Sequence, residues 1–234
     1  MAGPVALVGS GEYLPAMLEV EAALLAGRPP RYVQLPTAAG REGEASVARW
    51  IALGAAQARR LGVEAVPLRV LDRQTAGDEA LACQVAGAGL VYLSGGSPAH
   101  LADSLRDTPV WAAIVNEWRG GAALAGCSAG AMALTSWVPD LLHPNGSAHP
   151  GLGVVPMLRV LPHFDRMQRW ARWVAETLAA RSPDGVTLVG IEEDTAMVSD
   201  GTDLRRWTVR GRQSVWVLTR HGRQRFRVGD AVSV

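Results

Sequence analysis

Apolar and polar residues follow one another along the chain in blocks that predict strands and helices in turn. Short apolar runs predict buried parallel strands, since such strands are covered on both faces; they occupy residues 5–9, 31–36, 63–68, 89–96 and 122–126. Between them, apolar residues at helical spacing predict helices over residues 14–25, 41–61, 78–85 and 110–121. Pro67 lacks the N–H that a central strand needs, so we expect the third strand at a sheet edge.

The second half of the chain continues this pattern and then changes. After a Pro- and Gly-rich loop over 139–153, strands are predicted at 158–164 and 186–191, with a helix at 167–180 between them. From about residue 195, apolar and polar residues alternate between turns, which predicts antiparallel strands. The predicted fold class is therefore a three-layer α/β/α sandwich with a largely parallel sheet. We expect one domain over residues 1–234, with a C-terminal antiparallel extension at about 195–234.

Composition and charge exclude several classes of function. The chain has 48% hydrophobic and 19% charged residues and a net charge of +1, so neither nucleic acid nor membrane is an expected partner. All 23 basic residues are arginine, and a chain without lysine has no Schiff base, Ser-Lys dyad or P-loop lysine. Its two cysteines fit neither a disulfide framework nor a zinc site. With no signal-like N-terminus and no apolar run of about 18 residues, we expect a cytoplasmic protein.

The stretch AGCSAGA, residues 125–131, places two nucleophilic side chains next to each other. Centred on Ser128, it fits Gly-x-Ser-x-Gly, a tight strand-to-helix turn that lifts the serine above the sheet. The flanking glycines leave room for neighbouring backbone, whereas centring the turn on Cys127 would put alanines there. The helix that begins after Ser128 offers free N–H groups and its dipole to an oxyanion. Small residues also occur at such turns for packing alone, so a catalytic serine needs a base nearby.

Among the five histidines, His163 is the preferred base. It ends an apolar strand, at the edge of the sheet where Ser128 is expected. A base also needs an orienting carboxylate, and the residues alone leave several candidates open. The carboxylate candidates are Glu192, Glu193, Asp194, Asp165 and Asp140. The other histidines are expected at the surface, in a cap or in loops, namely His100, His143, His149 and His221.

Several segments together resemble the cyanophycinase and aspartyl dipeptidase (peptidase E) family of serine peptidases. They are ALVGSGE, YLSGGSPAHL, AGCSAGAMAL, GLGVVPMLRVLPHFDRMQRWAR and GIEEDTAMVSDG, and the resemblance covers most of the chain. The last segment and the strand-rich tail are more similar to the cyanophycinase branch. The family implies a flavodoxin-like, class I glutamine amidotransferase-like fold.

The resemblance also implies a site. Ser128 would be the nucleophile, His163 the base and Glu193 the acid of a catalytic triad. Backbone N–H groups of Gly96 and Ala129 would bind the oxyanion. The expected substrate is a short, aspartyl-containing peptide, cleaved at an amide or isopeptide bond through an acyl-enzyme on Ser128. No cofactor or metal is implied.

The chain departs from cyanophycinases beside this site. Ser97 and Pro98 follow the Gly-Gly turn where the family has Asp-Gln, so we expect a substrate other than cyanophycin. Arg166, Arg169 and Arg172 echo an arginine-rich run after the family's histidine. At helical spacing they share one face and, with Ser97, can bind a substrate carboxylate; a solvated basic face is the alternative.

Two other functions are considered beside the serine peptidase. A cysteine-dependent glutamine amidohydrolase would use Cys127 in the same fold, and a ligand-binding homologue would keep the turn without catalysis. The eight tryptophans are compatible with a homodimer face, although core packing is their more ordinary role. Trp170 and Trp173 lie beside the predicted arginine face.

Overall fold

The main sheet of the computed structural model has eight strands in the order β14-β11-β10-β1-β5-β4-β2-β3. Strands β1 to β5 run parallel, whereas β10, β11 and β14 are antiparallel to their neighbours. Their bounds are β1 (Val5–Val8), β2 (Arg31–Leu35), β3 (Glu64–Pro67), β4 (Leu90–Leu93), β5 (Ala123–Cys127), β10 (Thr195–Ser199), β11 (Arg206–Gly211) and β14 (Ala231–Ser233). The structure describes residues 1–139, 148–166, 177–179, 182–201, 203–220 and 222–234.

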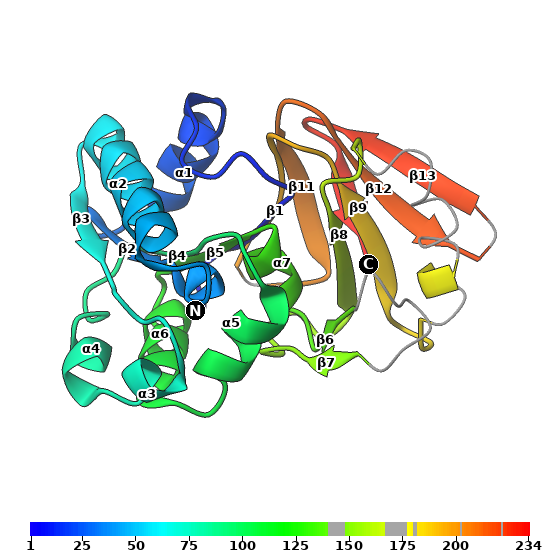
Figure 1. Cartoon of the computed structure of the whole chain (residues 1–234). Coiled ribbons are helices and arrows are strands. Elements are labelled where there is room, and N and C mark those ends of the chain that lie inside the picture. Colours follow the sequence, from blue (N-terminus) through cyan, green and yellow to red (C-terminus); the bar gives the residue numbers. More distant parts are fainter. Residues whose placement is uncertain (140–147, 167–176, 180–181, 202, 221) are drawn as a thin grey trace.

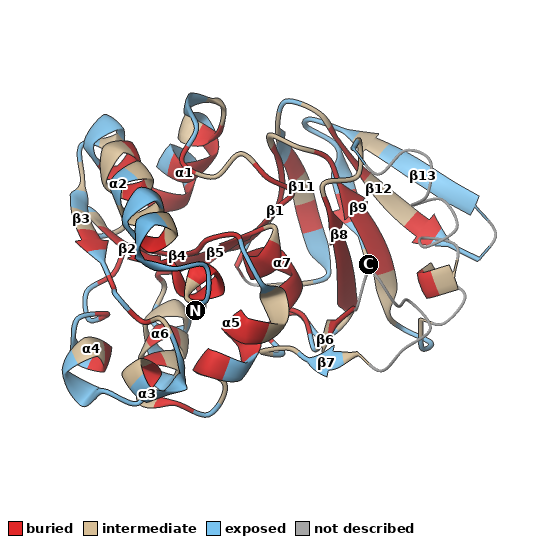
Figure 2. Cartoon of the chain, in the orientation of Figure 1, coloured by how far each residue is buried: buried red, intermediate tan, exposed pale blue. Residues whose placement is uncertain are grey.

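Burial on both faces explains why the apolar runs form the centre of this sheet. Strands β1, β4 and β5 are buried along their whole length, and Figure 2 shows the burial concentrated in the middle of the sheet. β3 is the outermost strand, so Pro67 lies at an edge, as its missing N–H predicts.

Helices cover both faces of the main sheet, which gives the three layers that the pattern predicts (Figure 1). On one face, α1 (Leu18–Leu25) and α2 (Glu44–Leu61) share a buried cluster with Ala6, Val8 and Tyr32 of the strands. The other face packs against α5 (Pro98–Leu105), α6 (Pro109–Arg119) and α7 (Ala129–Ala133) in a larger cluster that contains Val5 and Leu7. The short helices α3 (Arg73–Ala76) and α4 (Glu79–Cys83) join this second layer.

Local sequence signals set the ends of the helices. The Thr108 side chain accepts a hydrogen bond from the Trp111 N–H, and Pro109 occupies the first turn, so α6 begins there. Gly62 adopts the left-handed conformation that ends α2. The helix predicted at 14–25 begins with a 3₁₀ turn, η1 (Pro15–Met17), which has Pro15 at its first position. A second 3₁₀ turn, η2 (Thr37–Ala39), follows β2.

A second sheet has four strands in the order β13-β12-β9-β8. They are β8 (Leu158–Pro162), β9 (Thr187–Ile191), β12 (Ser214–Thr219) and β13 (Gly222–Arg227). One face of this sheet joins the larger core cluster through Val160, Val189 and Val215. The sequence predicts these strands but not their separate sheet. Both sides of β1 are already paired in the main sheet, one with β5 and the other with β10. β8 therefore pairs with β9 in a sheet of their own.

The remaining segments are short. β6 (Trp137–Val138) and β7 (His149–Pro150) form a two-stranded pair; β6 precedes the loop predicted over 139–153, and β7 lies within that loop. Most of the helix predicted at 167–180 lies outside the described residues. The part of it that is described, 177–179, is helical. Across the described ranges, no helix has both the length and the apolar character that crossing a bilayer requires.

Candidate active site

Ser128 occupies a strained turn between β5 and α7. Its backbone has φ 49° and ψ −106°, a conformation that residues with a side chain rarely adopt. A Cβ on Gly126 would come within 2.5 Å of the Gly130 backbone, and a Cβ on Gly130 would overlap the carbonyl oxygen of Leu93. Both glycines are therefore needed for the strand and the helix to meet at this turn, as the register centred on Ser128 predicts.

His163 lies directly against Ser128, with its Nε2 2.7 Å from the serine Oγ. It follows β8, and its backbone also has a positive φ, of 95°. The N–H groups of His163 and Phe164 both donate to the carbonyl oxygen of Ile191, at 3.3 and 3.1 Å, which fixes the turn to the end of β9. The second sheet thus brings an imidazole to the serine of the main sheet.

Glu193 completes a line of contacts through the imidazole ring. Its Oε1 lies 3.3 Å from His163 Nδ1, while Nε2 of the same ring faces Ser128. The side chains of His163 and Glu193 are 39% and 25% exposed, so solvent or a substrate can reach the site. This is the geometry of a serine, histidine and carboxylate triad, which can carry out nucleophilic attack on a carbonyl group.

The neighbouring Glu192 points into the protein instead. Its carboxylate accepts hydrogen bonds from the Ser214 N–H at 2.9 Å and from Trp216 Nε1 at 2.8 Å. The side chain is therefore occupied in joining β9 to β12. Glu192 directly follows β9, whereas Glu193 begins the turn that leads to β10, and the two side chains take different partners there.

The other carboxylate candidates occupy other places. Asp165 accepts a hydrogen bond from the Glu193 N–H at 2.9 Å, so it holds the backbone of that residue. Asp194 has a positive φ of 52°, and its Oδ1 fills the space where a Cβ on Gly11 would stand. Asp140 lies outside the described residues.

Arg166 contacts the acid rather than standing apart from the site. Its Nε and one terminal nitrogen each lie 3.0 Å from Glu193 Oε2, the carboxylate oxygen that His163 does not contact. The Arg166 side chain is 74% exposed. Arg169 and Arg172, predicted to share a face with it, lie outside the described residues, as do Trp170 and Trp173.

The Gly-Gly turn after β4 lies beside Ser128. The Gly95 N–H donates to Glu12 Oε1 at 3.0 Å, so the amide of this residue is already engaged. Gly96 has φ 135°, and a Cβ there would come within 2.5 Å of the Ala38 carbonyl oxygen. Ala129 is the first residue of α7, where N–H groups have no intrahelical partner. Because α7 has only five residues, its free N–H groups would contribute more than a helix dipole to the stabilisation of an oxyanion.

Ser97 and His100 have structural contacts in α5. The Ser97 side chain accepts from the His100 N–H at 3.3 Å and so caps the helix, while the Ser97 N–H donates to Ala38 at 2.8 Å. His100 is buried, with Nε2 2.8 Å from the Leu71 carbonyl oxygen, so the expectation of a surface position is wrong.

Of the remaining histidines, the structure describes His149 alone. His149 is exposed in β7, and His143 and His221 lie outside the described residues. Within the part of the chain that the structure describes, no three His, Cys, Asp or Glu side chains gather as metal ligands would.

Cys127 is fully buried beneath the turn, in the cluster on the α1 and α2 face. Its Sγ donates to Glu12 Oε2 at 2.9 Å, and burial, followed by the nearby Glu12 carboxylate, raises the pKa of the thiol well above its ordinary value. Because the thiolate is the nucleophilic form, this environment disfavours Cys127 and favours Ser128.

Glu12 is the residue at this site that sequence analysis misses. Its two carboxylate oxygens join the Gly95 amide to the Cys127 thiol, and so the Gly-Gly turn to the strand that ends at the nucleophile. The available signal is its position: it directly follows the Gly-Ser-Gly turn after β1, at the edge where the other site residues lie.

Known proteins are similar to this chain over most of its length. The model of peptidase family S51 matches residues 5–207. A cyanophycinase from Synechococcus elongatus is 32% identical over 171 residues, which are 68% of this chain and 51% of the relative. A cyanophycinase from Trichormus variabilis is 29% identical over 185 residues, 74% of this chain and 59% of the relative. The chain thus spans between half and three fifths of the curated relatives it matches.

Solved structures are similar over nearly the whole chain. A crystal structure of a peptidase from an acI-B1 Actinobacterium is 39% identical, with a TM-score of 0.91, and the match covers 100% of this chain and 98% of that one. A putative peptidase E protein from Listeria monocytogenes EGD-e is 15% identical, with a TM-score of 0.63 over 90% and 99% of the two chains. This second likeness concerns the fold alone.

Proposed function

Because the chain belongs to peptidase family S51, we propose that it is a serine peptidase with Ser128 as its nucleophile. The observation that carries the proposal is the 2.7 Å contact between Ser128 Oγ and His163 Nε2 at a strained strand-to-helix turn. The position of Glu193 behind the imidazole supports the same assignment.

Cleavage proceeds in two stages with His163 carrying the proton. Ser128 Oγ forms a bond to the scissile carbonyl carbon while His163 Nε2 accepts the hydroxyl proton. When the C–N bond breaks, His163 gives that proton to the leaving amine, and the acyl group remains on Ser128. A water molecule then attacks the acyl carbon, gives one proton to His163, and releases the carboxylic acid as His163 returns the proton to Ser128.

The surrounding groups orient the base and stabilise charge. Glu193 holds the His163 ring with Nδ1–H directed at the carboxylate, which leaves Nε2 free to accept the serine proton. Asp165 fixes the Glu193 backbone. The N–H groups of Gly96 and Ala129 bind the oxyanion of the tetrahedral intermediate.

The proposed substrate is a short peptide with an aspartyl residue at the cleaved amide or isopeptide bond. The cyanophycinase relatives suggest this class, although this chain matches only part of their length. Arg166 uses two nitrogens on Glu193 and has further N–H donors on a side chain that is 74% exposed, so it can also bind a substrate carboxylate.

A library of short aspartyl and isoaspartyl peptides tests this function. The wild-type chain and Ser128→Ala are incubated with each peptide, and products are followed by mass spectrometry. We expect cleavage by the wild type and a loss of at least about 10³-fold in Ser128→Ala, because the acyl-enzyme cannot form.

Two further reactions separate the alternatives. A fluorophosphonate probe should label Ser128 in the wild type, whereas a folded wild-type chain that stays unlabelled and cleaves nothing would point to a ligand-binding protein. Cys127→Ala serves as the matched variant one residue away. Activity that survives in Ser128→Ala but is lost in Cys127→Ala would contradict the proposal and favour the cysteine-dependent amidohydrolase.

A further inference from the structure

Two short connections cross between the main sheet and the second sheet at the candidate active site. Residues 192–194 lead from β9 to β10, and residues 212–213 lead from β11 to β12. The Arg212 N–H donates to the carbonyl oxygen of Asp194 at 2.9 Å, so the two connections lie side by side. Glu193, the proposed acid of the triad, is the middle residue of the first connection.

Gly211 permits this close approach. Its φ of 99° lies in the region that favours glycine, and a Cβ there would collide with the carbonyl oxygen of Asp194. A residue with a side chain would therefore push the second connection away from the first. The glycine thus allows Gln213 to reach the backbone of Glu193.

Side chains bind both backbone groups of Glu193. Its N–H donates to Asp165 Oδ1 at 2.9 Å, while its carbonyl oxygen accepts from Thr195 Oγ1 and from Gln213 Nε2, each at 3.0 Å. Because a carbonyl oxygen can only accept, the amide nitrogen of Gln213, and not the amide oxygen, faces it. The Gln213 N–H also donates to Thr195 Oγ1 at 2.9 Å, so Gln213 binds this backbone both directly and through the threonine.

The contact between Glu193 and His163 depends on where this backbone lies. Glu193 Oε1 is 3.3 Å from His163 Nδ1, slightly beyond the usual range of about 2.7–3.2 Å for such hydrogen bonds, so a small further shift would break the contact. Glu193 Oε2 contacts Arg166, whose side chain is 74% exposed and therefore gives the carboxylate little fixed support. Binding both backbone groups of Glu193 fixes the direction of its Cα–Cβ bond and keeps the carboxylate behind the imidazole.

We propose that Gln213 is a positioning residue of this active site and acts through the backbone of Glu193. The inference rests on the proposed function, in which Glu193 orients His163 and stabilises the imidazolium. Gln213 contributes no atom to the reaction. Its half-buried amide holds the acid in place, and groups in such sites must be held within about 0.5 Å of their productive positions.

Gln213→Met tests this role, because methionine has a similar size and offers no amide donor. We expect kcat to fall about tenfold on a cleaved peptide, with KM within about twofold of the wild type, since the acid acts on charge that develops after the substrate has bound. An unchanged kcat, or a change in KM alone, would overturn the proposal.

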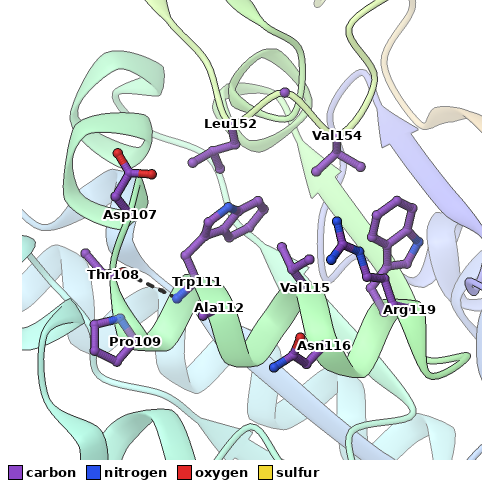
Figure 3. A pocket seen from close by; sticks show the side chains of 12 residues that line it. Asp107, Thr108, Pro109, Trp111, Ala112, Val115, Asn116, Arg119, Leu152 and Val154 are labelled. Atoms are coloured by element: carbon purple, nitrogen blue, oxygen red, sulfur yellow. Dashed lines mark hydrogen bonds between the residues drawn. The ribbon is translucent and has the colours of Figure 1, made fainter.

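Asn116→Leu is the matched control. It also replaces a side-chain amide by an apolar group of similar size, but Asn116 lies on α6, beside a groove of about 610 Å³ that Leu152 and Val154 border (Figure 3). Among the described residues, none of those that bind Glu193 lines this groove. Both kcat and KM should remain those of the wild type.

A double variant separates positioning of the acid from a general effect on the fold. In a Glu193→Ala background the carboxylate is already gone, so adding Gln213→Met should lower kcat by less than about twofold further. A full tenfold loss in that background would show that Gln213 acts on something other than Glu193.

Thr195 supplies a second pair of variants at the same carbonyl oxygen. Its side chain is fully buried. Thr195→Val keeps the shape without the hydroxyl and should lower kcat about tenfold, whereas Thr195→Ser keeps the hydroxyl and should stay within about threefold of the wild type. Equal kcat values in the two variants would contradict the role of this carbonyl oxygen. If Gln213→Met does not fold by circular dichroism, Gln213→Ala takes its place.

The proposed function and this inference fail in different ways. Cleavage that requires Ser128 but is insensitive to Gln213→Met would leave the function intact and overturn the positioning role. If no peptide is cleaved in a Ser128-dependent manner, the function fails, and crystal structures of the wild type and Gln213→Met test the positioning alone. Glu193 Oε1 should then lie at least about 0.5 Å farther from His163 Nδ1 in the variant, and an unchanged contact would refute the inference.

Discussion

Ionisable groups on the two sides of the turn at residues 127 and 128 differ in their exposure to solvent. On the side covered by α1 and α2, Cys127 and Glu21 are buried, and burial raises the pKa of each, that of Glu21 to about 7. On the side of the second sheet, His163 and Glu193 remain partly exposed and contact each other, and His163 also contacts Ser128. Two neighbouring nucleophiles in the sequence thus face two different environments.

The difference between these regions shows what makes a side chain suited to chemistry. A buried acid or thiol without a compensating positive charge favours its neutral form, which is a poor base or nucleophile. A partly exposed imidazole between a hydroxyl and a carboxylate can gain and lose a proton, because its charged form has a partner. Environment, more than residue type, therefore distinguishes Ser128 from Cys127. Three variants test this comparison.

The largest effect is expected from Glu193→Gln. An amide places N–H donors where the carboxylate accepts, so His163 is no longer held with Nε2 free to accept the serine proton. We expect kcat to fall by about 10³-fold, measured by steady-state kinetics on a cleaved peptide. Glu192→Gln, one residue away, is the matched control: it should reduce stability but keep kcat within about threefold. Equal losses of kcat in both variants would contradict the assignment of Glu193.

Glu21→Gln should change stability and leave the site unaffected. The Glu21 side chain is 1% exposed and accepts from the Tyr32 hydroxyl, and burial raises its pKa from 4.5 to about 7. The folded state therefore binds the proton more tightly than the unfolded state. The wild-type free energy of unfolding should fall as pH rises from 4.5 to 7, by up to about 3 kcal/mol from this group.

Urea denaturation at pH 5 and pH 8 measures this dependence. In Glu21→Gln the loss of stability between these pH values should be smaller than in the wild type by up to about 3 kcal/mol, with kcat unchanged. The same pH dependence in both proteins would show that Glu21 is not the responsible group.

The smallest effect is expected from Glu12→Ala, which connects the two regions. It removes the acceptor of the Gly95 N–H and of the Cys127 thiol, so the turn that carries Gly96 loses one of its attachments. We expect kcat to fall about tenfold with little change in KM, since the oxyanion forms only after the substrate has bound. Glu12→Gln keeps a carbonyl oxygen for Gly95 and should recover most of the rate. A KM effect alone, or no rescue by glutamine, would mean that Glu12 does not position this turn.

Local patterns predicted the parts of the fold that depend on neighbouring residues. The apolar runs predicted the five parallel strands of the main sheet, and Pro67 indicated the edge position of β3. The spacing of Gly126 and Gly130 around Ser128 predicted the register of the turn, because a steric conflict over a few residues can be read from their identities. Contacts that join distant segments could not be read in this way. The separate sheet of β8 and β9 and the bond from Glu12 to Gly95, 83 residues away, are examples.

The sequence by itself determined which segments are strands and helices and which serine stands between two obligatory glycines, because side-chain size and periodicity act over a few residues. Only the tertiary structure decided which of two adjacent glutamates faces His163, that Arg166 contacts that glutamate, and that Cys127 is held as a buried thiol. These outcomes depend on strand pairing and burial, which arise when distant segments pack against one another. The direction of a side chain and its access to solvent are properties of that packing, and the order of residues alone does not determine them.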